Sequence, residues 1–209
     1  MKLYLTPGTC SMASNIALHE AGIQFDLAKV DKRTKRVDGV DFLTINPKGY
    51  VPALQLDDGQ VLTENVAVLQ YIADLNPSAN LAPAAGTFER YRLQEWLSFI
   101  NSEVHKAFSP LFSSEATEDM KTYSRNYLAK RLAYVEQALG DKKYLMGDQF
   151  TIADAYLSTV LGWGAYAKVD IGPRLKAYLD GVRARPKVIE AMTAEGSIRP
   201  HAREASAHS

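Results

Sequence analysis

Hydrophobic and polar positions change their spacing along the first 75 residues. Short apolar runs predict strands over 2–5 and 25–30, and the stretch between them, 11–21, has helical spacing. Two further apolar runs flank the turn 57–60, which indicates a hairpin, and 63–75 is predicted to form a helix. The predicted order of elements is therefore β-α-β followed by β-β-α.

After residue 76 almost every apolar pattern has helical spacing. The segment 77–86 holds two prolines and a glycine, which is typical of a linker. We therefore expect an α/β domain over 1–76, an all-helical domain over 87–200 and a disordered tail over 201–209. Two apolar helix faces support the second domain: Leu93, Trp96, Leu97, Ile100 and Val104, and Leu128, Leu132, Val135 and Leu139.

One helix start inside the second domain has a specific signature. Thr151 and Asp154 have the spacing of a capping box, in which each side chain bonds the backbone of the other residue. The pair therefore predicts that a helix begins at this position.

Net charge, apolar run length and cysteine content exclude several classes of protein. The chain has 24 Lys and Arg against 24 Asp and Glu, so it lacks the net charge typical of proteins that bind nucleic acid or anionic membranes. No apolar run approaches 18 residues, and we expect neither a membrane span nor a secretory signal. Cys10 is the only cysteine, which excludes an internal disulfide and favours a cytoplasmic location.

Cys10 is the first candidate for chemistry, because it follows the first strand and precedes a helix. At a helix N-terminus, free N–H groups and the helix dipole favour a thiolate, so we expect its pKa to lie below about 8.5. The alternative is a buried structural thiol. No second cysteine follows three residues later, so any redox chemistry needs an external thiol.

Other candidates carry less specific signals. Glu64 and Asn65 either hold an amine and a carboxylate at a helix start or only cap the helix. The basic run 32–36 is usually a solvated loop. His105, beside Lys106, is more often an interface or surface residue than a ligand. Histidine and carboxylate spacings suggest no metal site, and nucleotide-binding and hydrolase motifs are absent from the sequence.

Several motifs together resemble the glutathione transferases over 1–196. They are Asn46-Pro-Lys-Gly-Tyr-Val-Pro-Ala-Leu, Leu62-Thr-Glu-Asn and Phe150-Thr-Ile-Ala-Asp-Ala. Pro7-Gly-Thr-Cys-Ser and Glu103-Val-His-Lys are similar to the bacterial beta class, which uses a cysteine where other classes use Tyr or Ser. The resemblance implies a thioredoxin-like first domain and an all-helical second domain.

The resemblance also implies a role for individual residues. Cys10 would face the glutathione sulfur, either by hydrogen bonding or as a mixed disulfide, with His105 and Lys106 approaching from the second domain. Val51, before a presumed cis Pro52, would pair with the cysteinyl backbone of glutathione. The remaining predicted contacts are Glu64 and Asn65 to the γ-glutamyl group, Lys35 to the glycyl carboxylate, and Ser102, Glu103 and Val104 near the sulfur. Ser98 stands where relatives can carry an Asn.

Three functions remain open at this point. The first is conjugation of glutathione, as co-substrate, to a small hydrophobic electrophile held by Phe108, Trp163 and Tyr166. The second is a glutathione-dependent thiol-disulfide reductase, and the third is a non-catalytic carrier of apolar ligands. The family further implies a homodimer, and no metal or nucleic acid is expected.

Overall fold

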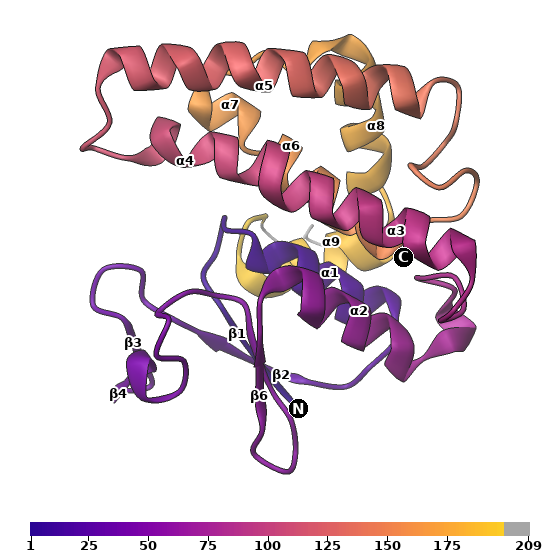
Figure 1. The fold of residues 1–209 in the computed structure, drawn as a ribbon. Helices are drawn as coiled ribbons and strands as arrows, with labels where there is room; N and C mark the ends of the chain where they lie inside the picture. The colour runs from indigo at the N-terminus through magenta and orange to yellow at the C-terminus, as the bar shows by residue number, and fades with distance from the viewer. Residues whose placement is uncertain (199–209) are drawn as a thin grey trace, which may run out of the picture.

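A small mixed sheet forms the first part of the computed structural model, which describes residues 1–198 (Figure 1). Its strands are β1(Lys2–Leu5), β2(Asp26–Lys29), β5(Ala53–Gln55) and β6(Val61–Thr63), in the spatial order β2-β1-β5-β6. β1 runs parallel to β2 and antiparallel to β5, and β6 is antiparallel to β5. The thioredoxin-like first domain is thereby confirmed.

Alternate residues of β1 face opposite sides of this sheet. Leu3 and Leu5 pack toward α1(Ser11–Glu20) and α2(Asn65–Leu75), whereas Tyr4 packs on Phe42 with ring centroids 5.7 Å apart. Phe42 belongs to a segment that the sequence pattern did not predict. That segment contains the short hairpin β3(Arg36–Val37) and β4(Val40–Asp41), followed by the 3-10 turn η1(Phe42–Thr44).

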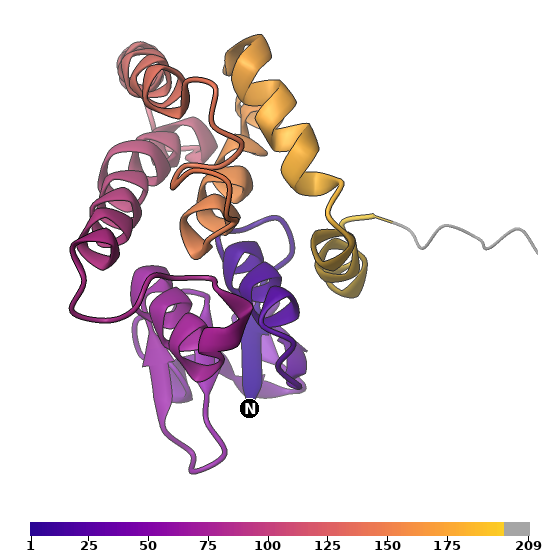
Figure 2. The ribbon, with the colours of Figure 1, turned by 90° about the vertical axis from the view of Figure 1, so that its right-hand side faces the viewer.

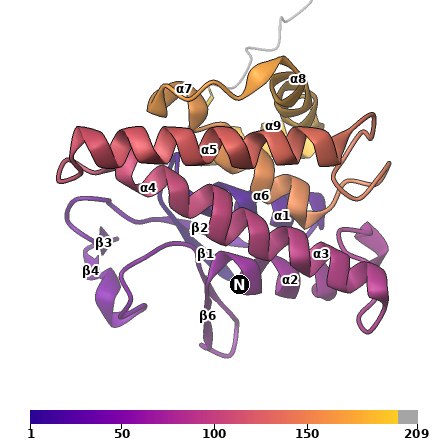
Figure 3. The same cartoon turned by 45° about the horizontal axis from the view of Figure 1, so that its top comes forward.

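The rest of the described chain is helical, which confirms the predicted all-helical second domain. After the 3-10 turn η2(Pro77–Ala79), its elements are α3(Phe88–Phe99), the π-helical turn η3(Ile100–His105), α4(Lys106–Phe112), α5(Glu118–Leu139), α6(Ile152–Leu161), α7(Gly164–Ala167), α8(Gly172–Arg183) and α9(Pro186–Glu195). α3, η3 and α4 follow one another as one long helix, and α5 lies along it (Figure 3). A π-helical turn inside an α-helix is frequently found at a functional site.

Trp96 departs from the predicted buried face of α3. Its neighbours on that face, including Leu93 and Leu97, are fully buried, but Trp96 is only partly buried. It packs against Phe99 and Tyr134, with centroids 6.0 and 6.2 Å away. The cause is that this face of α3 borders α5 near solvent rather than the centre of the core.

The predicted capping box forms at the start of α6. Asp154 is fully buried, and its carboxylate accepts the N–H and hydroxyl of Thr151, both at 2.9 Å. It also accepts the N–H of Leu145 at 2.9 Å and the hydroxyl of Tyr178 at 2.7 Å. Four donors to one carboxylate join the loop before α6 to α8.

α1 is buried on all sides, because both domains pack on it. One side contacts the sheet and α2, and other sides contact α6 and α9, the latter lying beside α1 in Figure 2. Ser11 through Leu18 are all buried. Asn15, in the middle of α1, donates to the carbonyl of Ala191 in α9 at 2.9 Å.

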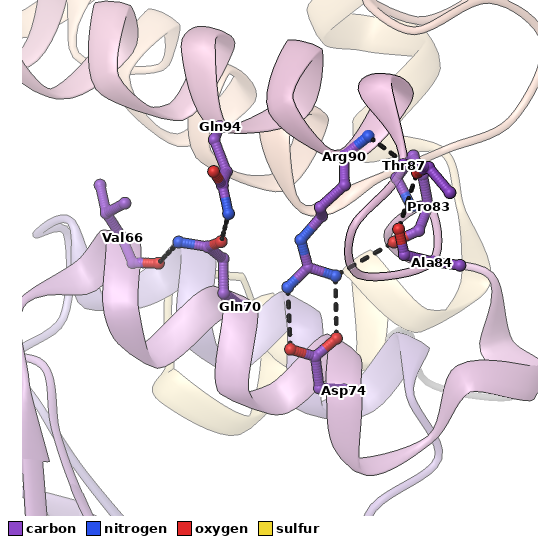
Figure 4. Close-up of polar contacts among 8 residues, drawn as sticks. All are labelled: Val66, Gln70, Asp74, Pro83, Ala84, Thr87, Arg90 and Gln94. Atoms are coloured by element: carbon purple, nitrogen blue, oxygen red, sulfur yellow. Dashed lines mark hydrogen bonds and ion pairs between the residues drawn. The ribbon is translucent and has the colours of Figure 1, made fainter.

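Polar bonds also join the two domains at α2 and α3 (Figure 4). The guanidinium of Arg90, which is buried, donates to both oxygens of Asp74 at 2.8 Å. One turn away, the amide of Gln94 donates to Gln70 at 2.9 Å. The predicted segment 77–86 therefore connects two bodies that are already fixed to each other.

The predicted domain limits at 76, 86 and 200 stay predictions, and the tail 201–209 lies outside the described residues. Within residues 1–198, no helix combines the length and the apolar character needed to cross a membrane.

Candidate active site

Cys10 is the N-cap residue of α1, at the end of the loop that follows β1. This loop turns at Gly8, whose φ of +76° is in the region that favours glycine. The hydroxyl of Thr9 donates to the carbonyl of Thr6 at 2.8 Å and closes the turn. The predicted position of Cys10 at a helix N-terminus is therefore correct.

The expected low pKa of Cys10 is wrong. Burial of the thiol raises its pKa to about 11, although its own backbone N–H and the charge of Lys106 act in the opposite direction. The charge of Glu64 raises it further. The loss of hydration destabilises the thiolate by more than the backbone N–H groups at the helix end and the charge of Lys106 stabilise it. At neutral pH, Cys10 is a protonated thiol, and its Sγ donates to the carbonyl of Val51 at 3.3 Å.

The Val51–Pro52 peptide bond is cis. Glu64, with φ +70°, precedes α2 and carries an exposed carboxylate that accepts from Lys48 at 2.7 Å. The structure thus brings the Val51 backbone next to Cys10 and leaves the Glu64 side chain at the surface.

Asn65 is buried, and its side chain is used inside the protein. Its amide donates to the carbonyl of Cys10 at 3.3 Å and accepts the hydroxyl of Ser14 at 2.7 Å. Asn65 therefore holds the start of α2 against the start of α1. What this helix start still offers to an anion is its first backbone N–H groups.

Lys35 contacts the residues that precede Val51. Its Nζ donates to the carbonyl of Gly49 at 2.9 Å and lies 5.8 Å from the ring centroid of Tyr50. The charge of Lys35 is thus held by the backbone of Gly49, two residues before Val51 in the sequence.

His105 comes from the second domain and is hydrogen-bonded to a buried tyrosine. The hydroxyl of Tyr156 lies 2.7 Å from Nδ1 of His105 and donates to Oδ1 of Asn101 at 2.9 Å. Because the Tyr156 hydroxyl donates its proton to Asn101, it can only accept a hydrogen bond from His105. Nδ1 of His105 therefore carries the ring proton, and Nε2 has the lone pair that can accept a hydrogen bond. Burial, with the charge of Lys106, lowers the pKa of His105 to about 4, so the ring is neutral at pH 7.

The sequence pattern did not identify Tyr156 or Asn101. Asn101 stands four residues before His105, but nothing in the sequence indicates that Tyr156 meets them. Burial also raises the pKa of Tyr156, which keeps its hydroxyl protonated.

The residues before Lys106 are not all directed toward Cys10. Glu103 bonds to Tyr127 and, at 2.9 Å, to Arg131, both on α5. Val104 is fully buried, and the exposed Ser102 donates to the carbonyl of Ser98 at 3.0 Å. Within one chain, the charge of Lys106 acts on both Cys10 and His105, while Glu103 is engaged by α5.

Trp163 links the predicted apolar pocket to the loop of Cys10. Its Nε1 donates to the carbonyl of Gly8 at 3.1 Å, and its ring lies 4.9 Å from that of His105 and 5.7 Å from that of Phe108. Phe108 is fully buried and can only support the pocket from behind, whereas Tyr166 is 85% exposed.

The described part of the chain contains no candidate metal-binding site. Residues 1–198 contain no group of three or more His, Cys, Asp or Glu side chains placed to share an ion.

Family models match both halves of the chain. The one described as "Glutathione S-transferase, N-terminal domain" matches residues 9–75, and the one described as "Glutathione S-transferase, C-terminal domain" matches residues 99–186. The first match begins at the loop of Cys10, and the second includes His105 and Trp163.

Individual proteins are similar over nearly the full length. Glutathione S-transferase GstA of Escherichia coli O157:H7 is 45% identical, with 94% of this chain and 99% of that protein covered. Among solved structures, a beta-class glutathione S-transferase of Sphingomonas chungbukensis is 48% identical with a TM-score of 0.91, and 95% of this chain and 100% of that one are covered. A sphingomonad glutathione S-transferase complexed with glutathione is 46% identical, with the same TM-score and the same coverage.

Proposed function

Because this chain belongs to the glutathione S-transferase family, we propose that it conjugates the thiol of glutathione to small hydrophobic electrophiles at the junction of Cys10, Val51 and His105. The observation that carries the proposal is a contact between the two domains at the loop of Cys10. Sγ of Cys10 donates to the Val51 carbonyl at 3.3 Å, while Trp163 of the second domain donates to the carbonyl of Gly8 at 3.1 Å and its ring lies 4.9 Å from the neutral ring of His105.

Glutathione would lie along the first domain. Val51 pairs with its cysteinyl backbone, Glu64 holds its amino group, and the backbone at Asn65 holds its γ-glutamyl carboxylate. Lys35 meets the glycyl carboxylate. Two observations support this orientation: the carboxylate of Glu64 is exposed, and the cation of Lys35 is held beside the Val51 loop.

The raised pKa of Cys10 favours one of its two possible roles. With a pKa of about 11, roughly one thiol in ten thousand is ionised at pH 7, so Cys10 is a poor nucleophile but a good donor. Sγ–H turns from the Val51 carbonyl to the glutathione sulfur and stabilises it as a thiolate. The glutathione thiol donates a hydrogen bond to Nε2 of His105. Because the pKa of that ring is about 4, it does not keep the proton, which passes on to water, and the positive charge of Lys106 stabilises the sulfur anion.

The electrophile binds beside that sulfur, against aromatic side chains of the second domain. Trp163 and Tyr166 form the wall, and Phe108 supports Trp163 from the core. In the reaction, the sulfur forms a bond to carbon and the leaving group departs with its electron pair.

Thiol-disulfide exchange is the second candidate, and the free thiol of Cys10 supports it. Cys10 would attack a mixed disulfide of glutathione, release the other thiol and keep the glutathione half as a disulfide. A second glutathione would then free Cys10 and leave as glutathione disulfide. A single free cysteine in the whole chain also supports a reducing cytoplasm as its location.

Two copies of the chain would form a homodimer. Glu103 is directed to α5, and the exposed Ser98 and Ser102 precede it on the same helix. Because Ser98 and Ser102 are exposed, a second copy of the chain can reach them.

Rates with an activated aryl halide and with a mixed disulfide of glutathione test both functions. Cys10→Ser keeps a hydroxyl donor and should retain conjugation within about threefold, whereas Cys10→Ala should lose about tenfold. Disulfide exchange should vanish in both variants. Equal loss of conjugation in both would identify Cys10 as a nucleophile, and no conjugation by the wild type would reject the proposal.

A further inference from the structure

Lys48 joins the loop that precedes Val51 to the start of α2. Its Nζ donates to Oε1 of Glu64 at 2.7 Å and to the hydroxyl of Thr63 at 3.0 Å. Glu64 is the residue before α2, and Lys48 stands three residues before Val51. The ion pair therefore connects two segments of the proposed glutathione site.

The backbone of Lys48 is fixed from inside the protein by Asn46, which is only 3% exposed. Oδ1 of Asn46 accepts the N–H of Lys48 at 3.1 Å, and the Asn46 amide donates to the carbonyl of Tyr50 at 2.7 Å. Lys35 also holds this loop, through the carbonyl of Gly49 at 2.9 Å. The ammonium of Lys48 thus extends toward Glu64 from a well-anchored backbone.

Glu64 has a backbone conformation that is uncommon for a residue with a side chain. Its φ of +70° lies in the left-handed region, and its side chain does not cap α2. Such a conformation costs free energy and is often found at ligand-binding positions. Within residues 1–198 the carboxylate is bonded through Oε1 only, and the side chain is 69% exposed. Oε2 is therefore accessible to a ligand.

We propose that Lys48 is a positioning residue, which holds the Glu64 carboxylate by Oε1 so that Oε2 can bind the α-amino group of glutathione. The inference rests on the proposed glutathione site, but it does not depend on which reaction Cys10 performs.

The charge of Lys48 has two opposing effects on the γ-glutamyl end of glutathione. It repels the α-ammonium and attracts the α-carboxylate, and because both groups are attached to one carbon, these Coulomb effects largely cancel. The remaining effect is one of order. Without Lys48, the exposed Glu64 side chain samples several rotamers, and a ligand that binds it must fix one of them. Loss of Lys48 should therefore weaken the binding of glutathione.

A double-mutant cycle on the full-length protein tests whether Lys48 acts through Glu64. Calorimetric titration with glutathione should give a dissociation constant about three- to tenfold higher for Lys48→Met than for the wild type. In a Glu64→Gln background, Lys48→Met should change this constant by less than about twofold, because no carboxylate remains to be held. Lys48→Arg keeps the ion pair and should bind glutathione like the wild type.

Lys187→Met is the matched control, because Lys187 also forms an exposed ion pair with a glutamate, Glu190, at 2.8 Å. It removes the same charge from the chain and should leave the dissociation constant unchanged. In Lys48→Met, the conjugation rate at saturating glutathione should stay within about twofold of the wild type, since Lys48 acts on binding and not on the sulfur. A general loss of structure would lower this rate as well.

Three results would overturn the inference. They are an unchanged dissociation constant in Lys48→Met, an equal loss in Lys48→Arg and Lys48→Met, and an equal loss with and without Glu64→Gln. A wild type that binds glutathione but forms no conjugate would reject the proposed conjugation alone, because the cycle measures binding. A wild type that binds no glutathione would reject both.

Discussion

The hydroxyl of Tyr156 lies 2.7 Å from Nδ1 of His105 and donates a hydrogen bond to Oδ1 of Asn101. Tyr156 is fully buried within the second domain, yet its hydroxyl sets the tautomer of the His105 ring. Tyr156 therefore acts on the proposed chemistry through His105, because it keeps the Nε2 lone pair available.

In Tyr156→Phe, no hydroxyl fixes the ring proton of His105 on Nδ1, so both tautomers should be populated. We expect the conjugation rate at pH 7 to fall about tenfold with little change in the KM for glutathione, since the imidazole then exchanges between two forms. ¹⁵N NMR of the His105 ring should change from Nδ1–H alone to a mixture. Tyr178→Phe removes another buried hydroxyl, which bonds Asp154 and not His105, and is the control. Identical ring spectra in the two variants would contradict the prediction.

Stability should depend on pH through His105. Its pKa of about 4 in the folded protein lies below the 6.5 of a free histidine, so between these values the unfolded chain binds more protons. The free energy of unfolding therefore falls as the pH drops from about 6.5 to 4. His105→Gln should reduce the difference in unfolding free energy between pH 7 and pH 4 by up to about 3 kcal/mol, measured by urea titration. An unchanged difference would show that the ring is not buried in its neutral form.

Alkylation of Cys10 by iodoacetamide should be slow at pH 7 and should rise up to at least pH 10. The reason is the pKa of about 11, since only the thiolate reacts. Lys106→Met removes a charge that lowers this pKa, and we expect a two- to fivefold slower reaction at pH 8, roughly the effect of one charge through a largely aqueous path. Lys121→Met, on α5 and paired with Glu118, is the matched control and should react like the wild type. A plateau in the rate below pH 8 would disprove the raised pKa.

Asp154→Ala should cost about 3–5 kcal/mol of stability, because it strands buried donors from Leu145, Thr151 and Tyr178. Thr151→Ala removes one side-chain bond and should cost about 1 kcal/mol. Urea unfolding measures both, and rates per folded molecule should be unaffected. A loss below 1 kcal/mol for Asp154→Ala would reject a stabilising role.

The secondary structure of both domains follows from local patterns, and the structure agrees with them at the strands, at α1 and α2 and at the capping box. Local patterns did not identify the hairpin β3–β4, whose strands have two residues each and no periodicity. They also placed Trp96 on the buried face, because helical spacing does not tell which part of a face meets solvent.

The site was predictable only where a residue acts through its place in one element. Cys10 at a helix start is such a case. The pKa of Cys10 was not predictable in this way, since it depends on how deeply the folded chain buries the thiol and on the charges of Glu64 and Lys106, which are far from Cys10 in the sequence. The pairing of Tyr156 with His105, 51 residues apart, likewise exists only after α6 packs on η3.

α1 carries Cys10 and is enclosed by both domains, so the first domain is not a portable module. A fragment of residues 1–76 would expose the side of α1 that meets α6 and α9, including Asn15, and would strand Asp74 without Arg90. Both parts should melt together in a single calorimetric transition. A chimera of two related proteins should keep its activity most easily when α1 and the helices that contact it, α2, α6 and α9, all come from the same parent.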